Sequence, residues 1–68
     1  SLEENRKYIG RAMEVLVEGS SKKDSNILSG RTRNNKVVNF KGSSDLAHKL
    51  IEVKIEEAFT WFLKGTII

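Results

Sequence analysis

Alternating apolar and polar residues mark the first regular element of this 68-residue chain. Between Met13 and Glu18 every second side chain is apolar, which is typical of a half-buried strand. The same period of two recurs over residues 51–56 and, less regularly, over 27–33, 37–40 and 62–68. Glycine, serine and asparagine residues interrupt this pattern about every ten positions, a spacing that favours turns between short strands. We therefore predict five strands and no long helix.

Five short strands of this kind are expected to close into a barrel, because open sheet edges invite aggregation. The all-β domain is predicted to cover residues 9–68, and the polar residues 1–8 to form the end of a linker. A single helical turn is expected over residues 46–49 with Ser44 as its cap, and Gly65 is expected at a bulge or a close-packing point. The predicted inward-facing residues are Met13, Val15, Val17, Leu28, Val38, Phe40, Ile51, Val53, Ile55, Leu63 and Ile67.

The register of the hairpin between the second and third strands decides where its arginines point. Two adjacent asparagines predict the turn, because asparagine tolerates a positive φ angle. A two-residue loop would place Arg31 and Arg33 on the same face as Val38, and burying two unpaired arginines would cost on the order of several kcal/mol. A three-residue loop of residues 34–36 would pair Thr32 with Val38 and turn both arginines outward. We predict the odd-length loop and a basic outer face with a lysine at its tip.

Composition excludes several kinds of chemistry within this segment. The chain has no cysteine and a single histidine, which excludes disulfides, iron–sulfur ligation and cysteine-based zinc sites. Glu56 and Glu57 are neighbours on a predicted strand and are expected to face opposite ways, so they offer no paired carboxylates. No apolar run approaches the ~20 residues that span a membrane, and the polar first residues show no signal-peptide pattern. We expect a cytoplasmic monomer with no membrane contact, no metal site and no catalytic residues.

Positive charge gathers in the middle of the chain. Residues 22–41 carry six basic groups and one acidic group, whereas the segments on either side each have a net charge of −1. Such a local excess attracts polyanions such as nucleic acid, although surface charge also serves solubility. Arginine and lysine neutralise phosphates, and asparagine can hydrogen-bond to bases or sugars or can simply form turns. The candidate RNA-binding residues are Lys22, Lys23, Arg31, Arg33, Asn34, Asn35, Lys36 and Asn39.

The run Gly-Arg-Thr-Arg-Asn-Asn-Lys-Val-Val-Asn-Phe at residues 30–40 resembles one known family. Together with residues 15–25, 51–58 and 63–65, it is similar to the C-terminal TRAM domain of bacterial MiaB-type tRNA adenosine methylthiotransferases. The resemblance implies a five-stranded antiparallel β-barrel, OB-like, that binds tRNA, with the anticodon stem-loop as the expected contact. It also implies a radical-SAM catalytic domain in the same polypeptide, which would carry iron–sulfur clusters and S-adenosylmethionine. That domain would add a methylthio group to a modified adenosine beside the anticodon.

Residues 59–62 depart from the family pattern, because they are aromatic where the family usually has a polar turn. Trp61 in this segment is expected either to stack on RNA or to pack, in the core or against other protein. Tyr8 is a further aromatic candidate without an assigned role. The aromatic segment leaves an alternative function open, in which the barrel is a docking module that packs against the catalytic domain. Nonspecific binding of single-stranded nucleic acid is a third interpretation.

Overall fold

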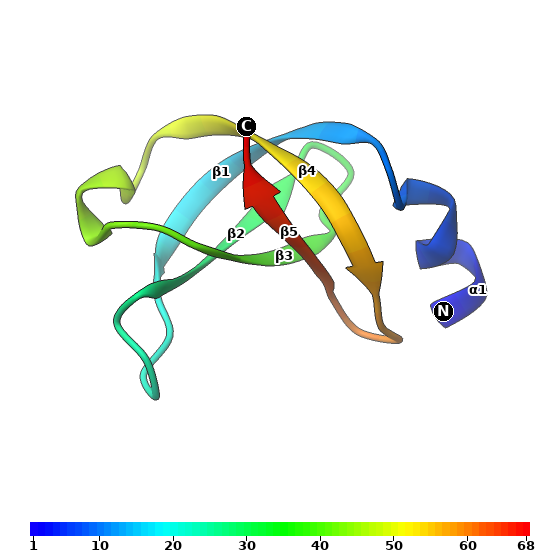
Figure 1. The fold of residues 1–68 in the computed structure, drawn as a ribbon, viewed down its shortest axis with the longest axis horizontal. Helices are drawn as coiled ribbons and strands as arrows, with labels where there is room; N and C mark the ends of the chain where they lie inside the picture. The colour runs from blue at the N-terminus through cyan, green and yellow to red at the C-terminus, as the bar shows by residue number, and fades with distance from the viewer.

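The five strands form where the alternating pattern predicts them in this computed structural model, which describes all 68 residues. They are β1 (Ala12–Ser20), β2 (Ile27–Thr32), β3 (Val37–Lys41), β4 (Leu50–Ala58) and β5 (Leu63–Ile67). The strands follow one another around a closed barrel in the order β1-β2-β3-β5-β4 (Figure 1). The ladder between β3 and β5 is parallel, and the other ladders are antiparallel. The predicted five-stranded all-β barrel is confirmed.

Alternation along the strands also predicted the core. Eight apolar side chains are buried inside the barrel, and every one of them was expected to face inward. Three further residues of the predicted set, Met13, Ile51 and Ile67, are partly buried and pack against this cluster. The eight core residues are Val15, Val17, Leu28, Val38, Phe40, Val53, Ile55 and Leu63.

The turn between β2 and β3 is a three-residue loop, so the predicted odd loop length is confirmed. The loop spans residues 33–35, whereas residues 34–36 were predicted. The Thr32 amide donates to the Lys36 carbonyl at 2.9 Å, and the Asn35 amide donates to the Thr32 carbonyl at 2.9 Å. Asn35 has φ of 66°, the left-handed conformation that this hairpin type needs after its type I turn. The Thr32 hydroxyl also accepts a hydrogen bond from the Lys36 amide at 3.0 Å. The loop therefore begins one residue earlier than predicted.

This change shifts the strand pairing without turning the side chains over. Val38 pairs with Gly30, so the predicted pairing with Thr32 is wrong by two residues. Because the shift is even, Val38 still faces inward and Arg31 still faces outward. The tight approach of β1 explains Gly30, since a side chain there would collide with the Leu16 carbonyl group.

A bulge in β4 changes the directions in which Glu56 and Glu57 point from those predicted. Ile55 pairs with Gly65 and Glu57 pairs with Lys64, so Glu56 is an extra residue without a partner in the ladder. Both glutamates are exposed and line the same shallow cavity, contrary to the prediction of opposite faces. Gly65 is a close-packing point as expected, because a side chain there would meet the backbone of β4.

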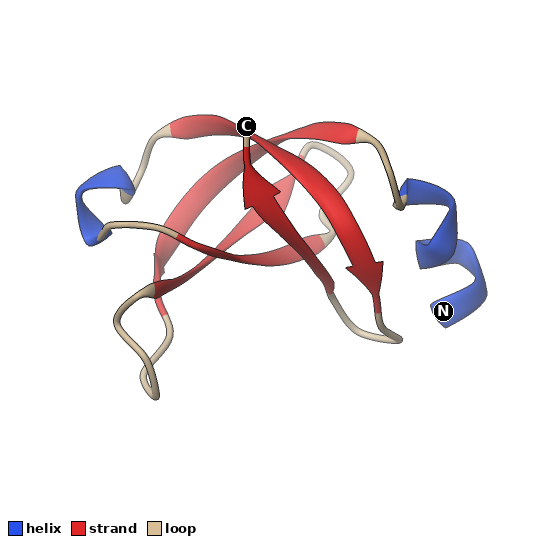
Figure 2. Cartoon of the chain, in the orientation of Figure 1, coloured by secondary structure: helices blue, strands red, loops and turns tan.

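Short helical segments lie at both ends of the barrel (Figure 2). α1 (Leu2–Asn5) and the 3-10 turn η1 (Arg6–Tyr8) form from residues expected as the end of a linker. The Asn5 side chain is 3 % exposed, and its Nδ2 donates to the Phe59 carbonyl at 2.7 Å. Tyr8 packs against the core. The N-terminal segment is thus fastened to the turn between β4 and β5.

The helical turn before β4 begins earlier than predicted. It is the 3-10 turn η2 (Ser44–Leu46), and its cap is Ser43, whose hydroxyl accepts a hydrogen bond from the Asp45 amide. After it, His48 takes a positive φ of 70° while its amide donates to a carbonyl of β1 at 2.7 Å. This conformation is unfavourable for a residue with a side chain.

Candidate nucleic-acid interface

The arginines of the β2–β3 hairpin point outward but have acidic neighbours. Arg31 Nε lies 3.4 Å from Glu18 Oε2, and Arg33 Nη2 lies 2.8 Å from Glu14 Oε1. Leu16 of β1 pairs with Arg31, so the two glutamates on either side of Leu16 flank the arginines. The arginines of the predicted basic face of the hairpin are therefore paired with carboxylates of the neighbouring strand β1. Charge counting along the chain missed the mixture because the acidic residues come from β1, outside the basic segment.

Lys36 turns back toward the N-terminal segment and does not extend from the tip of the hairpin. Its Nζ donates to Glu4 Oε1 at 3.2 Å and lies 6.0 Å from the centre of the Tyr8 ring. The hydrogen bond and the charge of Lys36 lower the pKa of Glu4 below its ordinary value of 4.5. Lys36 therefore helps hold α1 against the barrel.

The ion pairs between the arginines and glutamates are exposed and weak, so each arginine can exchange its glutamate for another anion. Exposed ion pairs contribute only ~0.2–1 kcal/mol, and the Arg33 side chain is 86 % exposed. A phosphate group is a good competing partner because it can accept two parallel hydrogen bonds from one guanidinium. A phosphate could therefore replace either glutamate as the partner of its arginine.

A groove lies between the start of β1 and the β2–β3 turn, and it brings two arginines together. Its volume is about 620 Å³, and the residues that line it include Tyr8, Arg11, Glu14, Arg33 and Asn34. The Arg11 guanidinium lies 5.8 Å from the centre of the Tyr8 ring. Asn34 Nδ2 donates to the Tyr8 hydroxyl at 2.8 Å. This groove joins cationic groups, hydrogen-bonding groups and an aromatic ring in one place.

Sequence reasoning missed Arg11, and it left the role of Tyr8 undecided. Arg11 belongs to residues 1–21, whose net charge is −1, so the charge distribution gave no reason to select it. The sequence feature that could have indicated a role for Arg11 is its position between the aromatic residue Tyr8 and the first strand. Only the fold shows that Arg11 and Arg33 line the same groove.

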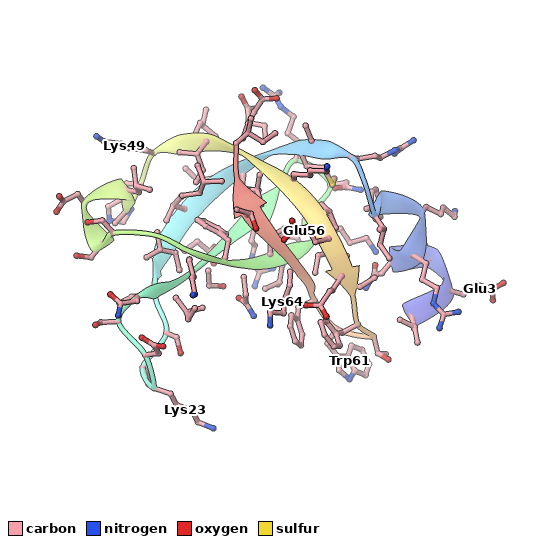
Figure 3. The ribbon with its side chains drawn as sticks, in the orientation of Figure 1. Glu3, Lys23, Lys49, Glu56, Trp61 and Lys64 are labelled. Carbon is pink, nitrogen blue, oxygen red and sulfur yellow. The ribbon has the colours of Figure 1, made fainter.

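The remaining predicted residues do not join this groove. Asn35 Oδ1 accepts a hydrogen bond from Arg31 Nη1 at 2.9 Å, beside the groove on the outer face of the hairpin. Asn39 lines a separate cavity of about 340 Å³ near β5. Lys22 and Lys23 lie in the β1–β2 loop, at the far end of β2, which is ~20 Å long at ~3.3 Å per residue. Figure 3 shows Lys23 at the tip of that loop.

The aromatic side chains have divided roles. Phe40 is 2 % exposed and belongs to the core, as expected. Trp61 is 85 % exposed, so a core role for it is excluded. Its neighbours Phe59 and Phe62 stack with ring centres 4.6 Å apart.

Two further observations concern metals and membranes. No group of three or more His, Cys, Asp or Glu side chains is placed to hold a metal ion. None of the helical segments has the length and apolar character that crossing a membrane requires.

Together, these observations describe a small β-barrel domain with arginine, glutamate, asparagine and tyrosine side chains around one groove. The chain belongs to the TRAM domain family, whose sequence profile matches residues 6–68. This match confirms the resemblance seen in residues 30–40.

Longer proteins contain closely similar segments. The chain is 50 % identical over its full length to the tRNA-2-methylthio-N(6)-dimethylallyladenosine synthase of Halalkalibacterium halodurans and covers 13 % of that protein. It is 53 % identical over its full length to the protein of the same name from Alkaliphilus oremlandii, of which it covers 14 %. For the Fusobacterium nucleatum protein the identity is 52 % over the full chain, which covers 16 % of it. The chain thus spans only a small part of the length of these relatives.

Proposed function

We propose that this chain is the tRNA-binding domain of a tRNA methylthiotransferase and that it contacts the anticodon stem-loop. The observation that carries the proposal is the groove whose lining includes both Arg11 and Arg33, together with Tyr8, Asn34 and the Glu14 partner of Arg33. The relatives support the choice of RNA, because their names describe synthesis of a modified adenosine in tRNA.

In this proposal the groove binds the phosphate backbone. Arg33 exchanges the Glu14 carboxylate for a phosphate oxygen, and Arg11 contacts the same or the next phosphate. Asn34 and the Tyr8 hydroxyl offer hydrogen bonds to sugar or base edges. Lys22 and Lys23, which form no ion pair, would provide a second contact at the other end of β2.

The chemistry of the whole protein would belong to another part of the polypeptide. A methylthiotransferase of this kind would use iron–sulfur clusters and S-adenosylmethionine to add a methylthio group to a modified adenosine next to the anticodon. This chain has no cysteine and no cluster of metal-binding side chains, so it does not offer the ligands of an iron–sulfur cluster. Its contribution would be to hold the tRNA, as a monomeric module of a cytoplasmic enzyme.

Fluorescence anisotropy with a labelled anticodon stem-loop RNA tests the proposal. A charge-assisted hydrogen bond contributes ~1.5–3 kcal/mol, so losing one such bond from each arginine in the double substitution Arg11→Ala and Arg33→Ala should weaken binding at low salt by at least ~150-fold. Lys64→Ala is the matched control, because Lys64 lies on β5, which neighbours neither β1 nor β2 in the barrel. Absence of binding by the unmodified chain at low salt would refute the proposal. Equal affinity for a single-stranded DNA of the same sequence would favour nonspecific binding instead.

A further inference from the structure

The turn between β4 and β5 exposes a large aromatic side chain without a partner. Trp61 is 85 % exposed and Phe59 is 37 % exposed. Tryptophan is usually well covered in folded proteins and is enriched at protein interfaces. Residues 58–63 include no charged side chain, so nothing in this turn repels an apolar surface.

The turn is held in a fixed shape. The Phe59 amide donates to the Phe62 carbonyl at 2.9 Å, and the two rings stack at an interplanar angle of 16°. Asn5 Nδ2 donates to the Phe59 and Thr60 carbonyls at 2.7 and 3.3 Å. The backbone that carries Trp61 is therefore held by hydrogen bonds, and it needs little further ordering when a partner covers this side chain.

The position of this turn beside the N-terminal segment indicates which part of a longer polypeptide could contact Trp61. α1 lies beside the turn, so the first residue of the chain is close to the exposed aromatic side chains (Figures 1 and 3). The relatives are about six to eight times longer than this chain, because it covers 13–16 % of them. A polypeptide that enters through α1 would bring its preceding domain next to Trp61 at a high effective concentration.

We propose that Trp61 and Phe59 form a docking anchor for the domain that precedes this barrel in the same polypeptide. The inference rests on the proposed function, because it takes the chain to be the C-terminal domain of such a longer protein. RNA is the less favoured occupant, because aromatic platforms for nucleic acids combine stacking with a positively charged groove. Residues 58–63, which form the turn and its flanks, contain no cation. Docking would fix the orientation of the tRNA-binding groove relative to the catalytic domain.

Hydrogen exchange followed by mass spectrometry tests this proposal in the full-length protein without RNA. Amides of residues 59–62 should exchange about tenfold more slowly in the full-length protein than in the 68-residue chain. Trp61→Ser should remove this protection, and proteolysis between the two domains should become faster. Leu50→Ser is the matched control, because Leu50 is 60 % exposed but lies at the opposite end of β4.

The outcomes separate docking from RNA binding. Equal exchange of these amides in the full-length protein and in the 68-residue chain would overturn the docking proposal. Protection that appears only after tRNA is added would assign Trp61 to the RNA surface and also overturn it. The exchange of residues 59–62 is first measured without RNA. The docking result therefore does not depend on whether the groove binds tRNA.

Discussion

Glu14→Gln should strengthen RNA binding, because it removes the negative charge that pairs with the predicted RNA-binding residue Arg33. In the folded chain Glu14 Oε1 accepts a hydrogen bond from Arg33 Nε at 3.0 Å and forms an ion pair with Nη2 at 2.8 Å. Arg33 must leave this partner when it binds a phosphate. Such an exposed pair contributes ~0.2–1 kcal/mol, and removing it should therefore raise tRNA affinity by roughly 1.5- to 5-fold.

Fluorescence anisotropy at low and moderate salt measures this change. Glu57→Gln is the matched control, because it removes the same charge from the pair with Lys64 on the other side of the barrel. At 0.1 M salt charges more than ~10 Å apart are largely screened, so the control should change affinity little. Unchanged or weaker binding by Glu14→Gln would refute the exchange of carboxylate for phosphate. An equal gain in both variants would show that only net charge matters.

Three further predictions concern stability. Gly65→Ala should lower the free energy of unfolding by ~2–3 kcal/mol, because its methyl group meets the backbone of β4; wild-type stability in urea would contradict the close packing. His48→Gly should raise that free energy by roughly 0.5–1 kcal/mol, since φ at this position is 70°; a lower urea midpoint would refute this. The pKa of Glu4 is lowered, chiefly by its hydrogen bond from Lys36, so its contribution to stability is present above pH 4.5 and is lost as pH falls through the folded pKa. Titration by NMR should show that Lys36→Ala raises this pKa toward 4.5; no change would exclude the contact.

The fold was predictable because alternation alone determines which side chains can be buried together. Residues 51–56 alternate cleanly and residues 13–18 alternate except at the exposed Leu16, and the buried positions within both segments follow from this pattern. The hairpin shows the limit of this argument. Burial cost excluded an even-length loop but could not choose between pairing Val38 with Thr32 or with Gly30, because both keep the same faces. The choice depends on where an asparagine takes the left-handed conformation.

The candidate site was less predictable, because it depends on neighbours that are distant in the sequence. The segmental charge identified Arg31 and Arg33, and both are exposed on the barrel surface. It did not identify Glu14, which forms an ion pair with Arg33, or Arg11, which lines the same groove as Arg33. Such contacts come from the closure of the barrel, and no pattern within a single strand encodes them.

The salt dependence of tRNA affinity tests the central claim most directly. If Arg11 and Arg33 bind phosphates, log affinity should fall with log salt concentration at a slope of about −1.5 or steeper, at ~0.7–0.9 for each phosphate. Arg33→Ala should make the slope shallower by ~0.7–0.9, whereas Lys64→Ala should leave it unchanged. A slope near zero, or one that Arg33→Ala does not alter, would contradict the account.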